Sequence, residues 1–132
     1  MLAITSKSPY AVRALADLAR TGAERPVPIS EIAKRRDIPV QFLEGLFASL
    51  RRAGVLQSQR GVKGGYSFAR PPDDVTVLEI VELLEGALSL DGGGGQVWSE
   101  AVEALRGVLG RVTVADVARQ ETEAATAPMY YI

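Results

Sequence analysis

Two helical patterns separated by a tight turn constrain the fold of this chain more than any other feature of its sequence. The first begins at Ser30, which is expected to cap a helix of about two turns, and it stops before Pro39 because proline cannot continue a helix. The second runs over residues 40–54 and ends at a glycine. Its apolar side chains recur at helical spacing: Phe42, Leu43, Leu46, Phe47 and Leu50. A short helix, a tight turn and a longer helix predict a helix-turn-helix.

The period of the sequence changes from helical to strand-like after residue 54. Residues 55–60 and 65–70 predict a β-hairpin, with Tyr66 and Phe68 on one face. Three glycines at 61, 64 and 65 allow a tight tip, and Arg60 and Lys63 give it positive charge. A basic hairpin directly after a helix-turn-helix predicts a winged helix. In that fold the second helix of the motif enters the major groove of DNA, and the wing reaches the adjacent backbone or minor groove.

Two other interpretations of this glycine-rich hairpin are weaker. A nucleotide-binding phosphate loop has the pattern G-x-x-x-x-G-K-[ST] between a strand and a helix, whereas this loop lies between two predicted strands. A plain surface hairpin is the simpler alternative, because glycine-rich turns are common. The position directly after the helix-turn-helix favours the wing.

Helices are also predicted on both sides of the winged region. Ser8 is expected to cap the first helix, with Pro9 at its first position, and Gly22 stops it. After the hairpin, Thr76 and Glu79 form a capping box that opens another helix.

A long amphipathic helix is predicted over residues 96–112, after a linker with four consecutive glycines. A domain of this size offers few surfaces to cover so long an apolar stripe. A partner subunit is the simplest cover, and a core or ligand-pocket role is the alternative. The stripe consists of Val97, Trp98, Ala101, Leu105, Val108, Leu109 and Val112. A last short helix is expected over residues 113–119, followed by a polar tail.

Charge divides the chain into two halves. Residues 1–70 hold 12 basic and 5 acidic residues, a net charge of +7, whereas the remainder holds 3 basic and 11 acidic residues, a net charge of −8. A basic half is expected to meet a polyanion such as nucleic acid. The alternative is two solvated surfaces that simply differ in composition.

Cysteine and histidine are absent from the 132 residues, which removes disulfides, thiolate and imidazole metal sites, and the usual nucleophiles and general bases. We therefore expect that the protein is not an enzyme and that it binds no cofactor. A chain of this length that is 47% hydrophobic can bury one core. It has no apolar run long enough for a bilayer and no signal-peptide pattern, so a cytoplasmic location is expected.

Three stretches of the sequence carry a resemblance to a known family: KSPYAVRAL at residues 7–15, the segment 26–86, and the VW pair at 97–98 that opens the long helix. The most specific part is LRRAGVLQSQRGVKGGYSFARP at residues 50–71. The chain is similar to the IscR/CymR (Rrf-type) family of bacterial winged-helix transcription regulators, and to its cluster-free CymR-like branch. The resemblance covers nearly the whole chain. It implies a homodimer on a pseudo-palindromic operator, with the long helix forming much of the dimer interface.

The resemblance also implies where DNA is bound. Gln41, Phe42 and Glu44 are expected to face base edges or the adjacent backbone, and Arg60 to lie in or near the minor groove. A carboxylate such as Glu44 can accept a hydrogen bond from cytosine N4 while repelling phosphate, which would make it a discriminator; a solvated surface carboxylate is the alternative. The full expected set is Lys7, Tyr10, Ser30, Gln41, Phe42, Glu44, Arg51, Arg52, Arg60 and Lys63.

The sequence departs from the family pattern in three places. Residues 91–95 read DGGGG where cluster-binding members have three cysteines, so thiolate ligation of an iron–sulfur cluster is excluded. KSPY at residues 7–10 replaces the more usual Lys-Gly-Arg-Tyr, and Gly45 stands where a longer polar side chain is common. The operator sequence therefore does not follow from the resemblance.

The last four residues are apolar at the end of a polar segment: Met129, Tyr130, Tyr131 and Ile132. Such side chains gain nothing in water, so they either fold back on the core or form a short partner-binding motif. They resemble the C-terminal isoleucine peptides that serine acetyltransferases insert into cysteine synthase. Regulators of the CymR type repress cysteine-metabolism genes together with that enzyme. The resemblance implies cysteine synthase as a partner.

The expected fold class is mostly α with a two-stranded β wing, that is, a winged helix-turn-helix plus a long C-terminal dimerisation helix. We expect a DNA-binding domain over residues 1–88, a glycine linker and dimerisation helices over 89–118, and a flexible tail over 119–132. The expected function is a dimeric repressor of cysteine or sulfur metabolism. A repressor that senses a small metabolite directly, and an interaction module that binds no DNA, are the alternatives.

Overall fold

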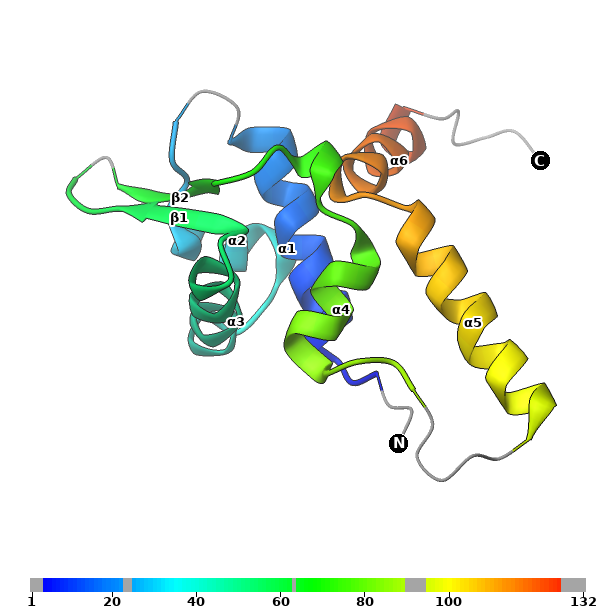
Figure 1. The fold of residues 1–132 in the computed structure, drawn as a ribbon. Coiled ribbons are helices and arrows are strands. Elements are labelled where there is room, and N and C mark those ends of the chain that lie inside the picture. The colour runs from blue at the N-terminus through cyan, green and yellow to red at the C-terminus, as the bar shows by residue number, and fades with distance from the viewer. Residues whose placement is uncertain (1–3, 23–24, 63, 90–94, 127–132) are drawn as a thin grey trace.

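The computed structural model describes residues 4–22, 25–62, 64–89 and 95–126 of the chain. Within these ranges, six helices pack into one body, and a two-stranded antiparallel sheet projects from one side of it (Figure 1). The elements are α1 (Lys7–Thr21), α2 (Ile29–Arg36), α3 (Val40–Arg52), β1 (Leu56–Gln59), β2 (Gly65–Phe68), the 3-10 turn η1 (Pro72–Asp74), α4 (Val77–Glu85), α5 (Gln96–Arg111) and α6 (Val114–Thr126). The predicted fold class is confirmed. No helix in these ranges is long and apolar enough to cross a membrane.

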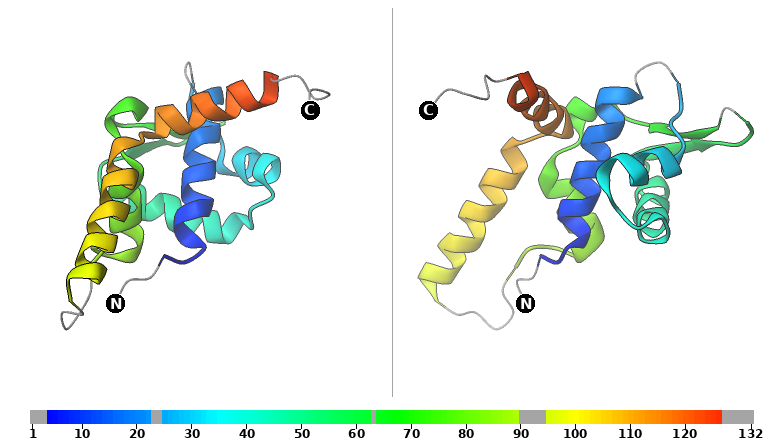
Figure 2. Two further views of the ribbon diagram at one scale, coloured as in Figure 1. Left: turned by 90° about the vertical axis from the view of Figure 1, so that its right-hand side faces the viewer. Right: turned by 180° about the vertical axis from the view of Figure 1, so that it is seen from behind.

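Helix α1 lies at the centre of the fold, with α2, α3 and the hairpin on one side and α4 and α5 on the other (Figures 1 and 2). The inner face of α3 packs into the core that α1 forms, and the predicted helical spacing is confirmed because four of its five apolar residues are buried. These are Leu43, Leu46, Phe47 and Leu50. The ring of Phe47 meets that of Tyr66 edge to face at 5.1 Å, which joins α3 to the hairpin.

The root of the wing is tied to the chain just ahead of α2. Val27 and Tyr66 exchange two backbone hydrogen bonds of 2.9 and 2.8 Å, which form an isolated antiparallel bridge beside β2. Gly65 has a φ of 153°, and a Cβ at this position would lie 2.3 Å from the carbonyl carbon of Val27. Only glycine allows the backbone at this position to lie so close to the backbone of Val27. The sequence alone indicated only a role for this glycine in the tight tip of the hairpin.

The predicted cap of α1 is wrong. The helix begins at Lys7 with Ser6 at the N-cap position, and Ser8 lies inside the first turn. The Ser8 side chain is buried, and its hydroxyl donates a 2.6 Å hydrogen bond to Glu85 at the end of α4. Glu85 also accepts two hydrogen bonds, of 2.8 and 2.9 Å, from the backbone N–H of Thr5. The sequence pattern predicted that the Ser8 hydroxyl bonds to the backbone of its own helix. Its partner is instead the carboxylate of Glu85, which is distant in the sequence.

The other two predicted caps differ in outcome. Ser30 is exposed in the first turn of α2, whose N-cap position is taken by Pro28, so this prediction is also wrong. Proline fixes φ and provides an extended entry to the helix without a side-chain cap. Thr76 does cap α4, because its hydroxyl oxygen accepts a 3.1 Å hydrogen bond from the Glu79 N–H.

Helix α6 is longer than predicted. It opens with a reciprocal cap in which Thr113 N–H donates to Asp116 at 2.9 Å and Asp116 N–H donates to the Thr113 hydroxyl at 3.0 Å. It continues to Thr126, so residues 120–126, expected in the tail, are helical. Good helix formers and an ion pair from Glu121 to α2 account for the extension. Figure 2 shows α6 lying across the C-terminal end of α1.

Replacing Gly65 with alanine is expected to lower the free energy of unfolding by roughly 1–3 kcal/mol, since the methyl group would overlap the Val27 backbone and strain φ. Gly45→Ala is the matched control, because a Cβ there would meet nothing within 4 Å. In the middle of α3 it should raise stability by roughly 0.5–1 kcal/mol. Urea unfolding at one protein concentration measures both. Equal effects of the two substitutions would contradict the close approach.

Candidate nucleic-acid interface

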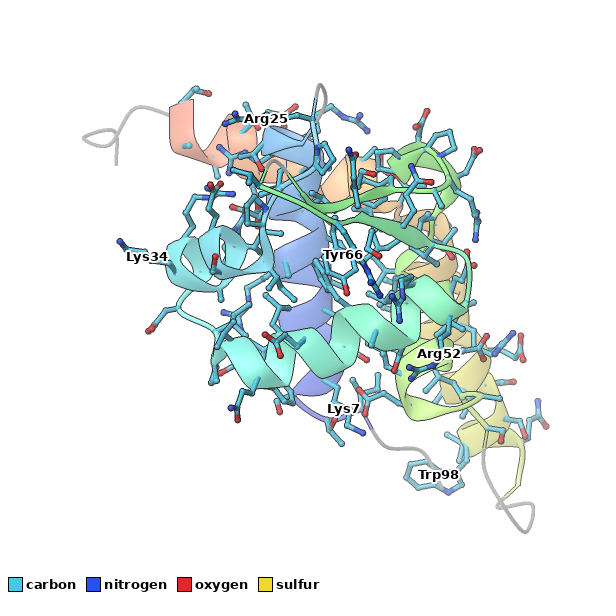
Figure 3. The ribbon with its side chains drawn as sticks, turned by 90° about the vertical axis from the view of Figure 1, so that its left-hand side faces the viewer. Lys7, Arg25, Lys34, Arg52, Tyr66 and Trp98 are labelled. Carbon is cyan, nitrogen blue, oxygen red and sulfur yellow. The ribbon has the colours of Figure 1, made fainter. Side chains whose placement is uncertain are left out.

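Helix α3 lies across one face of the molecule and presents a continuous outward surface (Figure 3). Opposite its buried residues, helical spacing places Gln41, Gly45, Ala48 and Arg52 in one row, with Glu44 beside them. A Cβ on Gly45 would meet nothing within 4 Å, so this row is open. Two small residues in its middle leave the helix backbone accessible. Sequence reasoning missed Ala48, although counting from the buried positions would have found it.

Phe42 and Tyr10 lie in the seam between α3 and α1. Their rings meet edge to face at 5.5 Å, both are half-buried, and the guanidinium of Arg13 lies 4.6 Å from the centre of the Tyr10 ring. Their first role is therefore to hold α3 against α1. Arg13 was absent from the predicted site, and its i, i+3 spacing from Tyr10 is the signal that could have found it.

A hollow beside α3 brings several predicted residues together. It lies between α3, the start of α1 and the end of α4, and its lining includes Lys7, Gln41, Phe42 and Ser49. The exposed side chain of Leu83 also lines it. One cation and two hydrogen-bonding side chains therefore share one depression next to the outward face of α3.

The wing tip carries its predicted arginine in the open. Arg60 follows β1 and is exposed, and Val62 beyond it is fully exposed. Gly61 has a φ of 113°, and the Gly64 N–H donates a 3.0 Å hydrogen bond to the Gly61 carbonyl, which closes the turn. Lys63 lies outside the described residues.

A buried carboxylate under α2 binds two arginines. Asp17 is only 5% exposed, and it accepts hydrogen bonds from Arg35 at 2.8 and 3.1 Å and from the Nε–H of Arg36 at 3.0 Å. Hydrogen bonding to Asp17 raises the pKa of Arg35. Pairing satisfies a charge whose burial would otherwise be costly.

Helix α6 adds a second carboxylate to this cluster. Glu121 accepts two hydrogen bonds from the Arg36 guanidinium, at 2.7 and 2.9 Å, and lies 3.5 Å from Arg20. The hydrogen bonds from Arg36 hold the pKa of Glu121 below its ordinary value, and those to Glu121 raise the pKa of Arg36. We call Asp17, Arg20, Arg35, Arg36 and Glu121 the α1–α2–α6 ion cluster.

The ion cluster removes part of the positive charge that the sequence count assigned to DNA. A further arginine, Arg70, pairs with Glu79. The cations left on the outer surface are arranged around α3, α2 and the wing, and Figure 3 labels four of them. Outside the ion cluster, the exposed basic residues in this part of the described chain are Lys7, Arg13, Arg25, Lys34, Arg51, Arg52 and Arg60.

The predicted apolar stripe of α5 is divided between two environments. Leu105, Leu109 and Val112 are half-buried, whereas Ala101 is exposed. Three larger apolar side chains are also exposed: Val97 by 66%, Trp98 by 57% and Val108 by 48%. The single chain therefore covers only part of the stripe. Met129, Tyr130, Tyr131 and Ile132, predicted to bind a partner, lie outside the described residues.

Comparison with known proteins gives consistent matches. The family described as "Rrf2: Iron-dependent Transcriptional regulator" matches residues 4–120. The chain is 35% identical over 130 residues to protein rrf2 of Nitratidesulfovibrio vulgaris, covering 88% of this chain and 87% of that one. For several other curated relatives it spans 49% to 58% of their length.

Two solved structures share the whole arrangement. T. potens IscR superposes with a TM-score of 0.84 at 39% identity, covering 98% of this chain and 97% of that one. The structure described as CymR, the global cysteine regulator of B. subtilis, superposes with a TM-score of 0.82 at 31% identity, covering 91% of this chain and 98% of that one.

The matching family is described as iron-dependent, and the side chains of this protein do not fit an iron–sulfur site. Thiolates, sometimes with imidazoles, hold such clusters, and the sequence contains neither cysteine nor histidine. Within the described ranges, no three acidic side chains gather into a possible metal site either. Among the described residues there is therefore no recognisable set of iron ligands.

The lowered pKa of Glu121 predicts a pH-dependent contribution to stability. A carboxylate with a depressed folded-state pKa stabilises the fold above its unfolded pKa, and this contribution is lost as pH falls through the folded pKa. Wild-type protein should therefore lose more unfolding free energy than Glu121→Gln between about pH 6 and about pH 3. Glu123→Gln, an exposed change on the same helix, should behave as wild type. Parallel pH profiles for all three proteins would contradict the ion-cluster assignment.

Proposed function

Because this chain belongs to the Rrf2 family of helix-turn-helix transcriptional regulators, we propose that it is a dimeric repressor that binds a pseudo-palindromic operator through α3 and the wing. One observation carries the proposal. Helix α3 and the wing lie on one side of the molecule, and α5, which exposes several large apolar side chains, lies on the other (Figure 1). One side thus suits DNA and the other suits a second copy.

In this proposal α3 enters the major groove. Gln41 can form a bidentate pair with adenine, and Glu44 can accept a hydrogen bond from cytosine N4. Gly45 and Ala48 allow the helix backbone to come close to the bases because they project little. Arg60 reaches the minor groove or its backbone from the wing.

Phosphate contacts are proposed for the cations around α3. Lys7 at the start of α1 shares the hollow beside α3 with Gln41 and Ser49, and Arg51 and Arg52 lie at the end of α3. Such contacts supply affinity and register without sequence information. Ser30 and Lys34 on the exposed side of α2 are placed for the same role.

The second copy is proposed to cover α5. In this scheme residues 1–88 bind DNA and residues 89–118 dimerise, while α6 packs back on α1 of the DNA-binding part. Association of two copies through α5 would present two α3 helices to the half-sites. In helix-turn-helix dimers these are separated by about 34–36 Å, one turn of DNA.

The regulated process is proposed to be cysteine or sulfur metabolism. Support comes from the structural likeness to CymR, whose description names it a global cysteine regulator, and from the absence of cluster ligands in this sequence. Cysteine synthase is the proposed signalling partner, with Met129 to Ile132 as the contact. That part rests on the sequence of the tetrapeptide alone.

Selection from a pool of random duplexes by the wild-type protein is expected to yield a two-fold related operator. Arg60→Ala should weaken binding to this operator strongly, because a charged groove contact is lost. Glu44→Ala should relax base preference with a smaller loss, or a gain, in affinity, because it removes a negative charge near phosphates. Fluorescence anisotropy over a salt series measures both. Wild-type affinity and preference in both variants would remove α3 and the wing from the interface.

Val108→Glu is expected to convert the dimer to a monomer. The side chain is 48% exposed in the single chain, so the charge disturbs little there, but it would be costly to bury unpaired between two copies. Leu105 is a poorer position because it is already half-buried within its own chain. Val62→Glu, the same change on the wing, is the control. Sedimentation equilibrium decides, and a Val108→Glu protein that sediments like wild type would place the interface elsewhere.

A protein lacking residues 129–132 is expected to keep operator binding and to lose association with cysteine synthase. Adding one residue after Ile132 should do the same, because the shifted carboxylate would leave pocket donors unpaired at about 1–3 kcal/mol each. Calorimetric titration of cysteine synthase with the three proteins is the measurement. Equal affinity for all three would remove the tetrapeptide from the mechanism and favour direct sensing of a small metabolite.

A further inference from the structure

We propose that Glu121 is a positioning residue for DNA recognition: it holds α2 through Arg36, and so fixes the orientation in which α6 and α1 present α3 to the operator. This inference rests on the proposed function. Neither Glu121 nor α6 belongs to the proposed DNA-facing surface, so any effect of Glu121 on operator binding has to pass through its ion-pair partners, Arg36 on α2 and Arg20 on α1.

The contact between Glu121 and Arg36 has directional geometry. Both guanidinium nitrogens of the terminal fork donate to the two carboxylate oxygens, at 2.9 and 2.7 Å. The side chains are 17% and 25% exposed for Arg36 and Glu121, so water competes only in part. The remaining Nε–H of Arg36 donates to the buried Asp17. Because the planar guanidinium of Arg36 is hydrogen-bonded along two edges, both its orientation and its distance from Glu121 are fixed.

Helix α2 depends on this contact because it has little packing of its own. It is eight residues long, and only Ile32 and Ala33 are buried in it. Arg36 is its last residue, and Asp37 then takes a left-handed conformation with a φ of 54°. Helix α3 begins at Val40. Arg36 therefore holds the C-terminal end of α2. The chain leads from this end into α3, so its position determines where α3 begins.

Helix α6 is held independently of α2, which makes it a firm support. Val114 and Ala118 are buried, and the Val114 N–H donates a 2.8 Å hydrogen bond to the Val75 carbonyl. The bridge between Thr76 and Thr113 attaches the start of α6 to the start of α4. Since α6 also follows α5 after two residues, the Arg36–Glu121 pair connects the proposed dimer helix to the helix-turn-helix.

A different role for Arg36 makes the opposite prediction. If Arg36 were a phosphate contact that Glu121 merely neutralised, removing the carboxylate would free a cation. Operator affinity and its salt dependence would then both rise. If Glu121 positions α2, removing it lowers operator affinity and leaves the salt dependence unchanged, because no phosphate contact is lost.

The experiment compares Glu121→Gln with Glu123→Gln, each of which removes one negative charge from α6. Glu123 is exposed and forms no ion pair within the described residues. Binding is measured to the operator selected by the wild-type protein and to a random duplex of the same length, over a salt series. Glu121→Gln is expected to bind the operator roughly tenfold more weakly, about 1.4 kcal/mol, with an unchanged salt slope and no loss on the random duplex. Glu123→Gln is expected to match wild type on the operator.

Arg36→Lys provides a second test that keeps the charge and removes the fork. It should reproduce the loss of operator affinity, and the double variant should be no weaker than Arg36→Lys alone, because that change already removes the fork that Glu121 binds. Unfolding curves at the assay temperature separate lost positioning from lost folding. Equal operator binding by the two glutamine variants, or tighter binding by Glu121→Gln, overturns the inference. A wild-type protein that selects no operator overturns the proposed function itself, and the inference with it.

Discussion

The arrangement of the helix-turn-helix depends on one buried carboxylate. Asp17 points from α1 into a nearly closed space, where an unpaired charge would cost several kcal/mol. Two consecutive arginines at the end of α2 satisfy it, so α2 is forced to lie with that end over α1. The apolar face of α3 then packs on the remaining surface of α1. The stability of the fold and the orientation of α3, the proposed DNA-facing helix, therefore have a common origin in this pairing.

Ion pairs within the chain leave less positive charge available for DNA than the net charge of the first seventy residues indicates. The first seventy residues carry a net +7, but Arg20, Arg35, Arg36 and Arg70 each contact a carboxylate of the same chain. Two of those carboxylates, on α4 and α6, belong to the acidic half of the sequence. Part of the basic half is thus neutralised by the acidic half on folding. The field that DNA would meet comes from a smaller set of cations gathered near α3, α2 and the wing.

The features that the sequence predicted correctly are those with a local cause. Helical spacing placed the buried face of α3, and the glycines marked the hairpin, because periodicity and turn geometry are decided within a few residues. Apart from the cap of α2, where Pro28 takes the position predicted for Ser30, the failures involve contacts between distant residues. Ser8 bonds to a carboxylate 77 positions away, and Arg36 to one 85 positions away. Phe42 fits the spacing of a surface residue or a core residue equally well, and only the presence of Tyr10 puts it in a seam.

The hydrogen bonds between Val27 and Tyr66 join the base of the wing to the segment that leads into the helix-turn-helix. In the proposed complex, this connection limits the change in distance between the point where α3 would meet the major groove and the point where the wing tip would meet the next groove. An operator would therefore have to keep a constant number of base pairs between these two points. One inserted pair would shift the second point by about 3.4 Å along the helix axis and rotate it about the axis as well. Tolerance to substitution and tolerance to insertion in the binding site are then separate properties, and the second is set by the backbone at Val27.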